Sequence, residues 1–445
     1  MTSRATRFPS AASLAQDLPP SLLLGAAVGA HSIDEMSRDA GVALVREVGS
    51  DFLSFVFSWQ RVQPGGTGRL AESALSAYDR LIDGLLAERI SPLAILLDGE
   101  SAEANDGTPE ALRGGWLNRD TARRFGDLAF QLAERFGDRI DRWVTLDAPA
   151  TLARRGPARG IRLPGAEAPG DPLDDLVAMG RTLLLGHGHA VEALRGAGVA
   201  GEIGLTNVHS PSEPVTSGDA DTAASWLFDA VHTLAFADPV LLGRYPRVPD
   251  HFASRLVRLI EVDESELALI HQPIDFYGCR YAFPSRVAAG SSTAPLPFRL
   301  SEWPEFETTA TGAPVAPDYL GVALSELDER YGEALPPVFV FAASPAFSEA
   351  LVLDERTGER VIADPRRIDY LARHLEEAVT ATASGSPASS LELRGYSVGD
   401  LFDEATRGAP SSRGCALVHV DGLTRELTPK DSYRWLQTLV DNRSR

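Results

Sequence analysis

The stretch Pro92-Leu-Ala-Ile-Leu-Leu-Asp98 is a short apolar run that ends on a carboxylate. It lies between two longer segments, Ala71 to Glu88 and Thr121 to Phe136, in which apolar residues recur at helical spacing. A continuous apolar run of this length is typical of a strand buried on both faces, as in a parallel sheet whose crossovers are helices. The stretch therefore indicates one strand of a parallel sheet with helices packed outside it.

The same alternation continues along the chain. Seven further runs have strand character: Leu22 to Ala30, Phe52 to Trp59, Trp143 to Asp147, Ile203 to Val208, Ile274 to Tyr281, Val338 to Ala342 and Gly395 to Gly399. The remaining predicted helices are Leu173 to Ala197, Ala220 to Ala237, Leu320 to Tyr331, Pro365 to Thr380 and Pro429 to Val440. Eight strands that alternate with helices predict an α/β fold, a single-domain (β/α)8 TIM barrel over residues 1–445 with an N-terminal extension over residues 1–20. Pro284 to Thr311, rich in Pro, Ser and Thr, is predicted to be a loop.

The charge of the chain excludes one class of partner. The formal net charge is −20, from 42 basic and 62 acidic residues, whereas nucleic-acid binding depends on Lys and Arg that neutralise phosphates. We therefore expect no nucleic-acid partner. Lys430 is the only lysine, and the other basic residues are arginine. Such usage, with abundant Ala and Gly, is typical of GC-rich coding rather than of a binding surface.

Other sequence patterns indicate where the protein is located and whether it contacts a membrane or binds a metal. The run Leu22 to Ala30 could pass for a signal peptide, but it fits a first barrel strand better, and no run approaches the ~20 apolar residues of a membrane helix. Cys279 and Cys415 lack the spacing of a disulfide framework or zinc site. We expect a cytoplasmic protein without membrane contact, metal or cofactor. His187 and His189 are two apart on a predicted helix and face different directions.

Three motifs carry a resemblance to a known family. They are GGWLNRD at Gly114 to Asp120, DPRRIDYLARHL at Asp364 to Leu375, and TPKDSYRWL at Thr428 to Leu436. In these stretches, and from about Phe8 to Val440, the chain resembles glycoside hydrolase family 1, the β-glucosidase family. The resemblance implies a (β/α)8 barrel with its site residues at the carboxyl ends of the strands, in agreement with the alternation.

The resemblance fails at both catalytic glutamates. The acid/base motif T-F-N-E-P corresponds here to Thr145, Leu146, Asp147, Ala148, Pro149, and the nucleophile motif I-T-E-N-G corresponds to Val340, Phe341, Ala342, Ala343, Ser344. Alanine can neither donate a proton nor attack an anomeric carbon, and retaining hydrolysis needs two carboxyl groups. The resemblance thus implies a family member that has lost retaining β-glucosidase chemistry.

The sugar-binding positions of the family also differ. Its glutamine after the first strand is Ser32, and its nucleophile-holding arginine on the second strand is Ser54. Its H-W-D motif reads Asp98, Gly99, Glu100, and both tryptophans and the glutamate after the eighth strand are absent, since the stretch reads Gly399 to Arg407. Tyr281 matches a tyrosine that contacts the nucleophile in the family. These replacements predict a roomier and more apolar pocket, suited to a partly apolar small molecule.

Polar residues that remain near the strand ends are the candidate site. Asp98 and Asp147 follow neighbouring strands, so that desolvation and repulsion could make them an acid/base pair, with Tyr281 or Arg280 stabilising negative charge. These three, Asp98, Asp147 and Tyr281, are the predicted catalytic residues. The predicted ligand-binding residues are His31, Ser32, Trp59, Glu100, Arg280, Phe341, Asp400 and Glu404. Equally, Asp98 and Asp147 could be polar residues tolerated at a solvated barrel mouth.

Three functions stay open from the sequence. The first is a repurposed enzyme, for example one of specialised metabolism, that performs a nonhydrolytic acid/base step on a partly apolar small molecule. The second is a noncatalytic pseudoglycosidase that binds a ligand or serves as an accessory protein, with a protein partner or a homo-oligomer. The third is a β-glycosidase whose carboxylates have moved to other positions of the barrel mouth.

Overall fold

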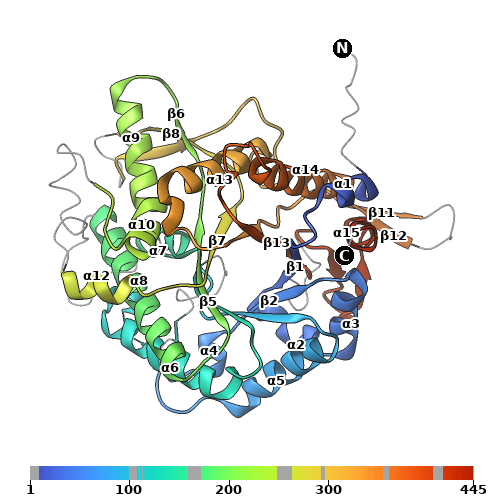
Figure 1. Ribbon diagram of the computed structural model, residues 1–445. Coiled ribbons are helices and arrows are strands. Elements are labelled where there is room, and N and C mark those ends of the chain that lie inside the picture. The colour runs from blue at the N-terminus through green and yellow to red at the C-terminus, as the bar shows by residue number, and fades with distance from the viewer. Residues whose placement is uncertain are drawn as a thin grey trace.

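A computed structural model gives the fold of the chain (Figure 1). It describes residues 10–99, 108–109, 111–112, 114–158, 172–247, 263–291, 296–353, 360–403 and 414–443.

Eight parallel strands form a closed barrel, as the sequence predicts. The strand order around the barrel is β1-β13-β10-β7-β5-β4-β3-β2. All eight predicted runs are confirmed as its strands: β1 (Leu23–Val28), β2 (Phe52–Val56), β3 (Ser91–Ile95), β4 (Arg142–Asp147), β5 (Glu202–Val208), β7 (Phe276–Tyr281), β10 (Val338–Ala342) and β13 (Leu393–Asp400). The chain is thus a single-domain (β/α)8 barrel.

A ring of helices surrounds the barrel (Figure 1). The predicted helices are confirmed with small shifts of their ends: α5 (Glu72–Ala87), α6 (Asp120–Phe136), α8 (Pro172–Gly196), α13 (Asp318–Tyr331), α14 (Pro365–Thr382) and α15 (Asp431–Asp441). The predicted helix Ala220 to Ala237 is three consecutive pieces, α9 (Asp219–Asp229), a π-helical turn η4 (Ala230–Leu234) and α10 (Ala235–Leu242). Shorter helices are α2 (Ile33–Met36), α3 (Asp39–Val48), α4 (Trp59–Val62), α7 (Pro149–Ala158) and α12 (Glu264–Ile270).

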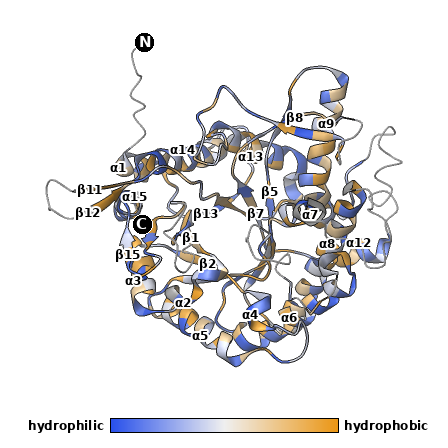
Figure 2. Cartoon of the chain, turned by 180° about the vertical axis from the view of Figure 1, so that it is seen from behind, coloured by the Kyte–Doolittle hydropathy of each residue, from blue (hydrophilic) through white to orange (hydrophobic). Residues whose placement is uncertain are grey.

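The outer helices bury one face each. In α6 the buried side chains Phe125, Leu128, Leu132 and Phe136 recur every three or four residues, which places them on one face against the barrel and α8. Burying one side chain of this size stabilises the fold by about 1.5–3 kcal/mol. Figure 2 shows hydrophobic and hydrophilic residues along the same outer helices. At the N-terminus, α1 (Ala11–Asp17) packs against α14 and α15.

Part of one predicted loop is folded. Pro284 to Thr311 contains β8 (Ser285–Ala289) and β9 (Phe298–Ser301), which form a three-stranded sheet with β6 (Ser212–Pro214). The sequence did not reveal these strands because β8 and β9 have only five and four residues. That is too few for an alternation of apolar and polar residues to be recognised. Two hairpins complete the fold: β11 (Ala350–Leu353) with β12 (Arg360–Ala363), and β14 (Val418–Val420) with β15 (Leu427–Pro429).

Large apolar side chains fill the interior of the barrel. Phe339 packs edge-on against Phe52 and Phe276, with ring centroids 5.8 and 5.2 Å apart. Val56, Ile95, Val144 and Phe341 belong to the same interior cluster. Since this cluster closes the barrel from within, a ligand can enter only from the carboxyl ends of the strands.

A buried network of charged side chains holds together the segments that follow β10 and β13 in the chain. Lys430 is fully buried, and its Nζ lies 2.6 Å from Glu349 Oε1 and 2.8 Å from Asp403 Oδ2. Arg367, also buried, pairs with Glu349 and Asp364. These pairs tie α14, the β11 hairpin and the segment after β13 into one unit. Among the described residues, no helix combines the length and apolarity needed to cross a membrane.

Candidate functional site

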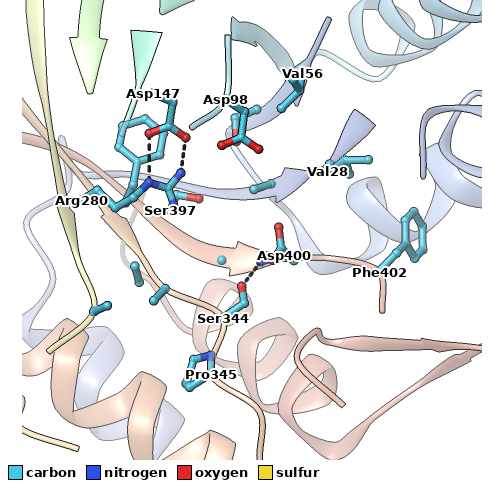
Figure 3. A pocket seen from close by; sticks show the side chains of 18 of the residues that line it. Val28, Val56, Asp98, Asp147, Arg280, Ser344, Pro345, Ser397, Asp400 and Phe402 are labelled. Atoms are coloured by element: carbon cyan, nitrogen blue, oxygen red, sulfur yellow. Dashed lines mark hydrogen bonds and ion pairs between the residues drawn. The ribbon is translucent and has the colours of Figure 1, made fainter. Parts of the chain in front are cut away.

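A cavity of about 320 Å³ opens at the carboxyl ends of the barrel strands. We call it the mouth cavity. Its floor is apolar, formed by Val56, Ile95 and Phe341 from the barrel interior. Its walls also carry the polar side chains of Asp98, Asp147, Arg280, Ser344, Ser397 and Asp400 (Figure 3).

Asp147 and Arg280 form a two-bond ion pair in the wall of this cavity. Arg280 Nε donates to Asp147 Oδ1 at 2.9 Å, and Arg280 Nη2 donates to Asp147 Oδ2 (Figure 3). The Asp147 side chain is 1% exposed and that of Arg280 is 16% exposed. Water therefore screens the pair weakly, and the guanidinium neutralises the Asp147 carboxylate. Beside this pair, the guanidinium lies 6.0 Å from the centre of the Phe341 ring.

A register shift in β4 turns Asp147 toward the cavity. The shift falls between Val144, which faces the barrel interior, and Asp147. Regular alternation from Val144 would bring Leu146 and Ala148 inward. The irregular register brings Asp147 inward in their place.

Asp98 lies next to Asp147, as the sequence predicts for neighbouring strands. The two residues form a parallel β-bridge, and Gly99 N donates to the Asp147 carbonyl at 2.7 Å. A Cβ on Gly99 would collide with the carbonyl oxygen of Ala148, so this close approach of two backbones requires glycine. Glycine at position 99 therefore sets how close Asp98 and Asp147 lie.

The two alanines at the expected catalytic positions lie in different surroundings. Ala342, at the end of β10, lines the mouth cavity. Ala148 is fully buried, does not line the cavity and has φ +50°, a left-handed conformation that costs a residue with a Cβ about 1 kcal/mol. The methyl group of residue 148 therefore does not line the mouth cavity. The chain turns away after Asp147 to begin α7.

The opposite wall is held by the segment after β13. Asp400 N donates to Ser344 Oγ at 2.6 Å, which fixes the end of β13 against the end of β10 (Figure 3). Gly399, the residue before Asp400, has φ +98°, where a side chain would be strained and would meet Ser344 Oγ. This junction holds Asp400 at the cavity.

The remaining predicted ligand-binding residues divide into three groups. His31 and Ser32, in the 3-10 turn η1 (Ala30–Ser32), line the cavity, as does Phe341. Glu100 and Glu404 lie outside the described residues. Trp59 departs from the prediction.

Trp59 and Tyr281 are both part of the core rather than of the cavity. Trp59 begins α4, is 1% exposed, packs against Trp116 and Phe125, and its indole Nε1 donates to Gln63 Oε1 at 3.0 Å. Tyr281 points outward from β7, because inward and outward positions alternate and Arg280 faces inward. Its hydroxyl donates to the Ala316 carbonyl at 2.6 Å. Burial raises the pKa of the Tyr281 phenol, which stays protonated, and its outward position and its bond to Ala316 keep it from stabilising charge in the cavity.

Other lining residues are absent from the sequence-based prediction. Ser397 faces inward from β13, Tyr370 reaches the cavity from α14, and Thr309 and Thr311 come from the segment after β9. Alternation along the predicted eighth strand could have indicated Ser397. No sequence signal indicates Tyr370, because a helix outside the barrel is not expected to reach its mouth. Among the described residues, no group of three or more His, Cys, Asp or Glu side chains is arranged to hold a metal ion.

Comparisons with known proteins agree with this architecture. Thermostable β-glucosidase B of Thermobispora bispora is 33% identical over 408 residues, which cover 90% of this chain and 78% of the relative. β-Glucosidase A of Thermotoga maritima is 29% identical over 404 residues, covering 90% of this chain and 84% of the relative. The crystal structure of the psychrophilic β-glucosidase BglU from Micrococcus antarcticus superposes with a TM-score of 0.80 at 26% identity, covering 98% of this chain and all of that one.

The family model agrees with these pairwise similarities over almost the same range. The model described as glycosyl hydrolase family 1 matches residues 25–445, which include most of β1, the other seven barrel strands and the three motifs quoted above. The chain belongs to glycosyl hydrolase family 1.

Proposed function

We propose that this member of glycosyl hydrolase family 1 binds a partly apolar small molecule in the mouth cavity and does not hydrolyse β-glycosides by the retaining mechanism. One observation carries the proposal. The end of β10 presents Phe341, Ala342, Ala343 and Ser344 to the cavity, none of which is ionisable near neutral pH. A retaining glycosidase needs a carboxylate nucleophile about 5 to 5.5 Å from its acid/base group.

The cavity suits a ligand with an apolar body and a few polar groups. Its volume of about 320 Å³ lies at the lower end of small-molecule sites. Ala27, Val28, Val56, Ile95 and Phe341 offer apolar contact, while Asp98, Asp400 and the Asp147–Arg280 pair offer fixed polar groups. A nonhydrolytic acid/base step would fall to Asp98, because Arg280 neutralises Asp147 and Tyr281 points away from the cavity.

The second candidate is a noncatalytic binding or accessory protein. The same ion pair favours it, since a carboxylate held by a guanidinium is a weak base. Asp98→Asn discriminates between the two. In an enzyme the variant would bind ligand and lose turnover, whereas in a binding protein it would change affinity at most.

A panel of chromogenic β-glycosides tests the negative part of the proposal. We expect no turnover above that of the Asp98→Asn, Asp147→Asn double variant purified in parallel, with the Thermotoga maritima β-glucosidase A as positive control. Contaminating host enzyme gives the same trace in both preparations. Turnover present in the wild type and abolished in the double variant would show that the carboxylates have moved within the barrel mouth, and the proposal would then be wrong.

A further inference from the structure

A second cavity lies in the ring of outer helices. We call it the side cavity. It has a volume of about 400 Å³ and shares no lining residue with the mouth cavity. Its lining comes from the segment that follows β5, from the end of α9 with the π-helical turn η4, and from α13. Arg330 of α13 holds Asp238 of α10 by two bonds, which places these helices side by side in the ring (Figure 1).

Three carboxylates line the side cavity: Asp229, Glu326 and Glu329. Asp229 and Glu326 are partly buried, and Glu329 is exposed. Ser212 Oγ donates to Asp229 Oδ2 at 2.7 Å, but none of the three carboxylates forms an ion pair with another described residue. The guanidinium in the lining, that of Arg330, is already bound to α10. The described lining of the cavity therefore carries an excess of negative charge.

This excess charge is unfavourable unless a cation or a proton offsets it. Burial raises the pKa of Asp229 to about 7, and the nearby charge of Glu326 adds to the shift. Burial also raises the pKa of Glu326, with the charge of Glu329 adding to it. Among the described residues, no three His, Cys, Asp or Glu side chains are arranged to hold a metal ion. An ammonium group, which has three N–H donors, suits this pair of carboxylates better.

An imidazole offers an uncharged contact in the same cavity. His209, in the segment after β5, lines the side cavity and is 6% exposed. Its Nε2 lies 3.0 Å from the Tyr277 hydroxyl, whereas its Nδ1 has no partner among the described residues. In contrast to Nδ1 of His232, which is enclosed and unpartnered, Nδ1 of His209 keeps accessible surface. This nitrogen therefore opens onto the side cavity.

The imidazole of His209 is neutral, because burial lowers its pKa to about 3. A neutral imidazole has one donor nitrogen and one acceptor nitrogen. A hydroxyl group can donate as well as accept, so it can bind Nδ1 in either tautomer. The side cavity thus offers anionic partners for an ammonium group and a neutral partner for a hydroxyl group.

We propose that the side cavity binds an amino alcohol, with its ammonium group on Asp229 and Glu326 and its hydroxyl group on Nδ1 of His209. The ligand class is a small protonated amine that carries a hydroxyl group. This site is separate from the mouth cavity, so the inference does not depend on the proposed function.

Three probes of equal size test the proposal: 3-amino-1-propanol, butylamine and 1,3-propanediol. Their dissociation constants are measured by ligand-observed NMR on the full chain, in phosphate buffer of low ionic strength at pH 8, where Asp229 is ionised. We expect 3-amino-1-propanol to bind about three- to tenfold more tightly than butylamine, the range given by one net hydrogen bond. The diol, which has no charge, should show no binding.

Glu326→Gln removes one of the proposed anionic partners. It should weaken binding of both amines about tenfold, the effect of one charge-assisted hydrogen bond. Glu333→Gln is the matched control, because it removes the same charge from the exposed turn η6 (Gly332–Ala334) that follows α13, outside the cavity. The control should bind the amines as the wild type does.

His209→Phe keeps a ring of similar shape without its nitrogen atoms. It should bind 3-amino-1-propanol no more tightly than butylamine, while butylamine binds as it does to the wild type. Thermal unfolding shows whether each variant is folded, and Glu326→Gln tests the site even where His209→Phe does not fold.

Three outcomes would overturn the inference. If neither amine binds the wild type, the carboxylates of the side cavity are offset by protons alone. If Glu326→Gln and Glu333→Gln bind the amines equally, the amines respond to the net charge of the chain and not to this cavity. If butylamine binds the wild type as tightly as 3-amino-1-propanol, His209 does not contact a ligand hydroxyl and the amino alcohol is the wrong class.

Discussion

Arg280 holds Asp147 by both carboxylate oxygens, and a register shift in β4 turns that carboxylate toward Arg280. In the family this chain belongs to, the sequence resemblance places the catalytic acid one residue later, at Ala148. The ion pair thus lies one residue before the position that the resemblance assigns to the acid. The pair gives the cavity a fixed dipole.

We expect the pair to stabilise the fold only as a pair. Asp147→Asn or Arg280→Met alone leaves one buried group without its counterion, which typically costs about 3–5 kcal/mol. The double variant should lose less than the sum of the two single losses. Urea denaturation of the four proteins measures this coupling, and additive losses would show that the two side chains act independently.

Glycine at position 99 should be required for the approach of two strand ends. Gly99→Ala places a Cβ against the carbonyl oxygens of Asp147 and Ala148, which are backbone atoms and cannot move aside easily. We expect a loss of about 1–3 kcal/mol in the free energy of unfolding. Gly29→Ala is the control, because a Cβ there meets no atom within 4 Å although Gly29 also lines the cavity. Equal stability of the two variants would contradict this role of Gly99.

A buried acid should give the stability a pH-dependent component. Burial, the largest influence, raises the pKa of Asp229 to about 7, while the hydrogen bond from Ser212 opposes the shift. The folded state then holds a proton between pH 4 and 7 that the unfolded state has released, so the contribution of this group to stability is fully present below about pH 4 and is lost progressively as the pH rises to 7. Asp229→Asn keeps an acceptor for Ser212. It should raise the melting temperature strongly at pH 8, less at pH 5, and leave it nearly unchanged below pH 4.

The melting temperature of Asp229→Asn is compared with that of the wild type at each pH. This comparison is needed because the buried histidines change the stability with pH in the opposite direction. Burial lowers the pKa of His187 to about 3, so its contribution to stability is complete above pH 6.5 and is lost as the pH falls toward 3. A difference between wild type and Asp229→Asn that is the same at pH 5 and pH 8 would contradict the titration of Asp229.

The sole lysine should be hidden from reagents. Lys430 is fully buried between Glu349 and Asp403. Under native conditions an amine-reactive ester should label the chain once, at the N-terminus, and after unfolding in guanidinium it should label the chain twice. Intact mass spectrometry counts the labels. A second label on the native protein would show that Lys430 exchanges into solvent on the time scale of the reaction.

The barrel could be predicted because its signal is repeated. Each strand is a short apolar run, and eight such runs separated by amphipathic segments leave few alternative folds. The same rule predicted that Asp98 and Asp147 meet, since the ends of neighbouring parallel strands lie at one edge of a sheet.

The orientation of single side chains could not be predicted so well. Regular alternation from Val144 would bring Leu146 and Ala148 inward, but the register shift between Val144 and Asp147 reverses the alternation, and a shift of one residue exchanges the two faces of a strand. Tyr281 was assigned through the resemblance alone, although alternation from Arg280 would have placed it outside. The position of Tyr370 at the cavity depends on how α14 packs against the barrel, and no local sequence pattern indicates that packing.

Burial of Lys430 also determines how self-association of this protein can be studied. With its one side-chain ammonium enclosed, amine-directed cross-linkers have only the chain terminus to join, and a dimer whose two termini lie beyond the reach of the linker would be recorded as a monomer. Carboxylate-directed coupling, for which the chain offers 62 acidic residues, or mass photometry without any linkage, is the appropriate choice.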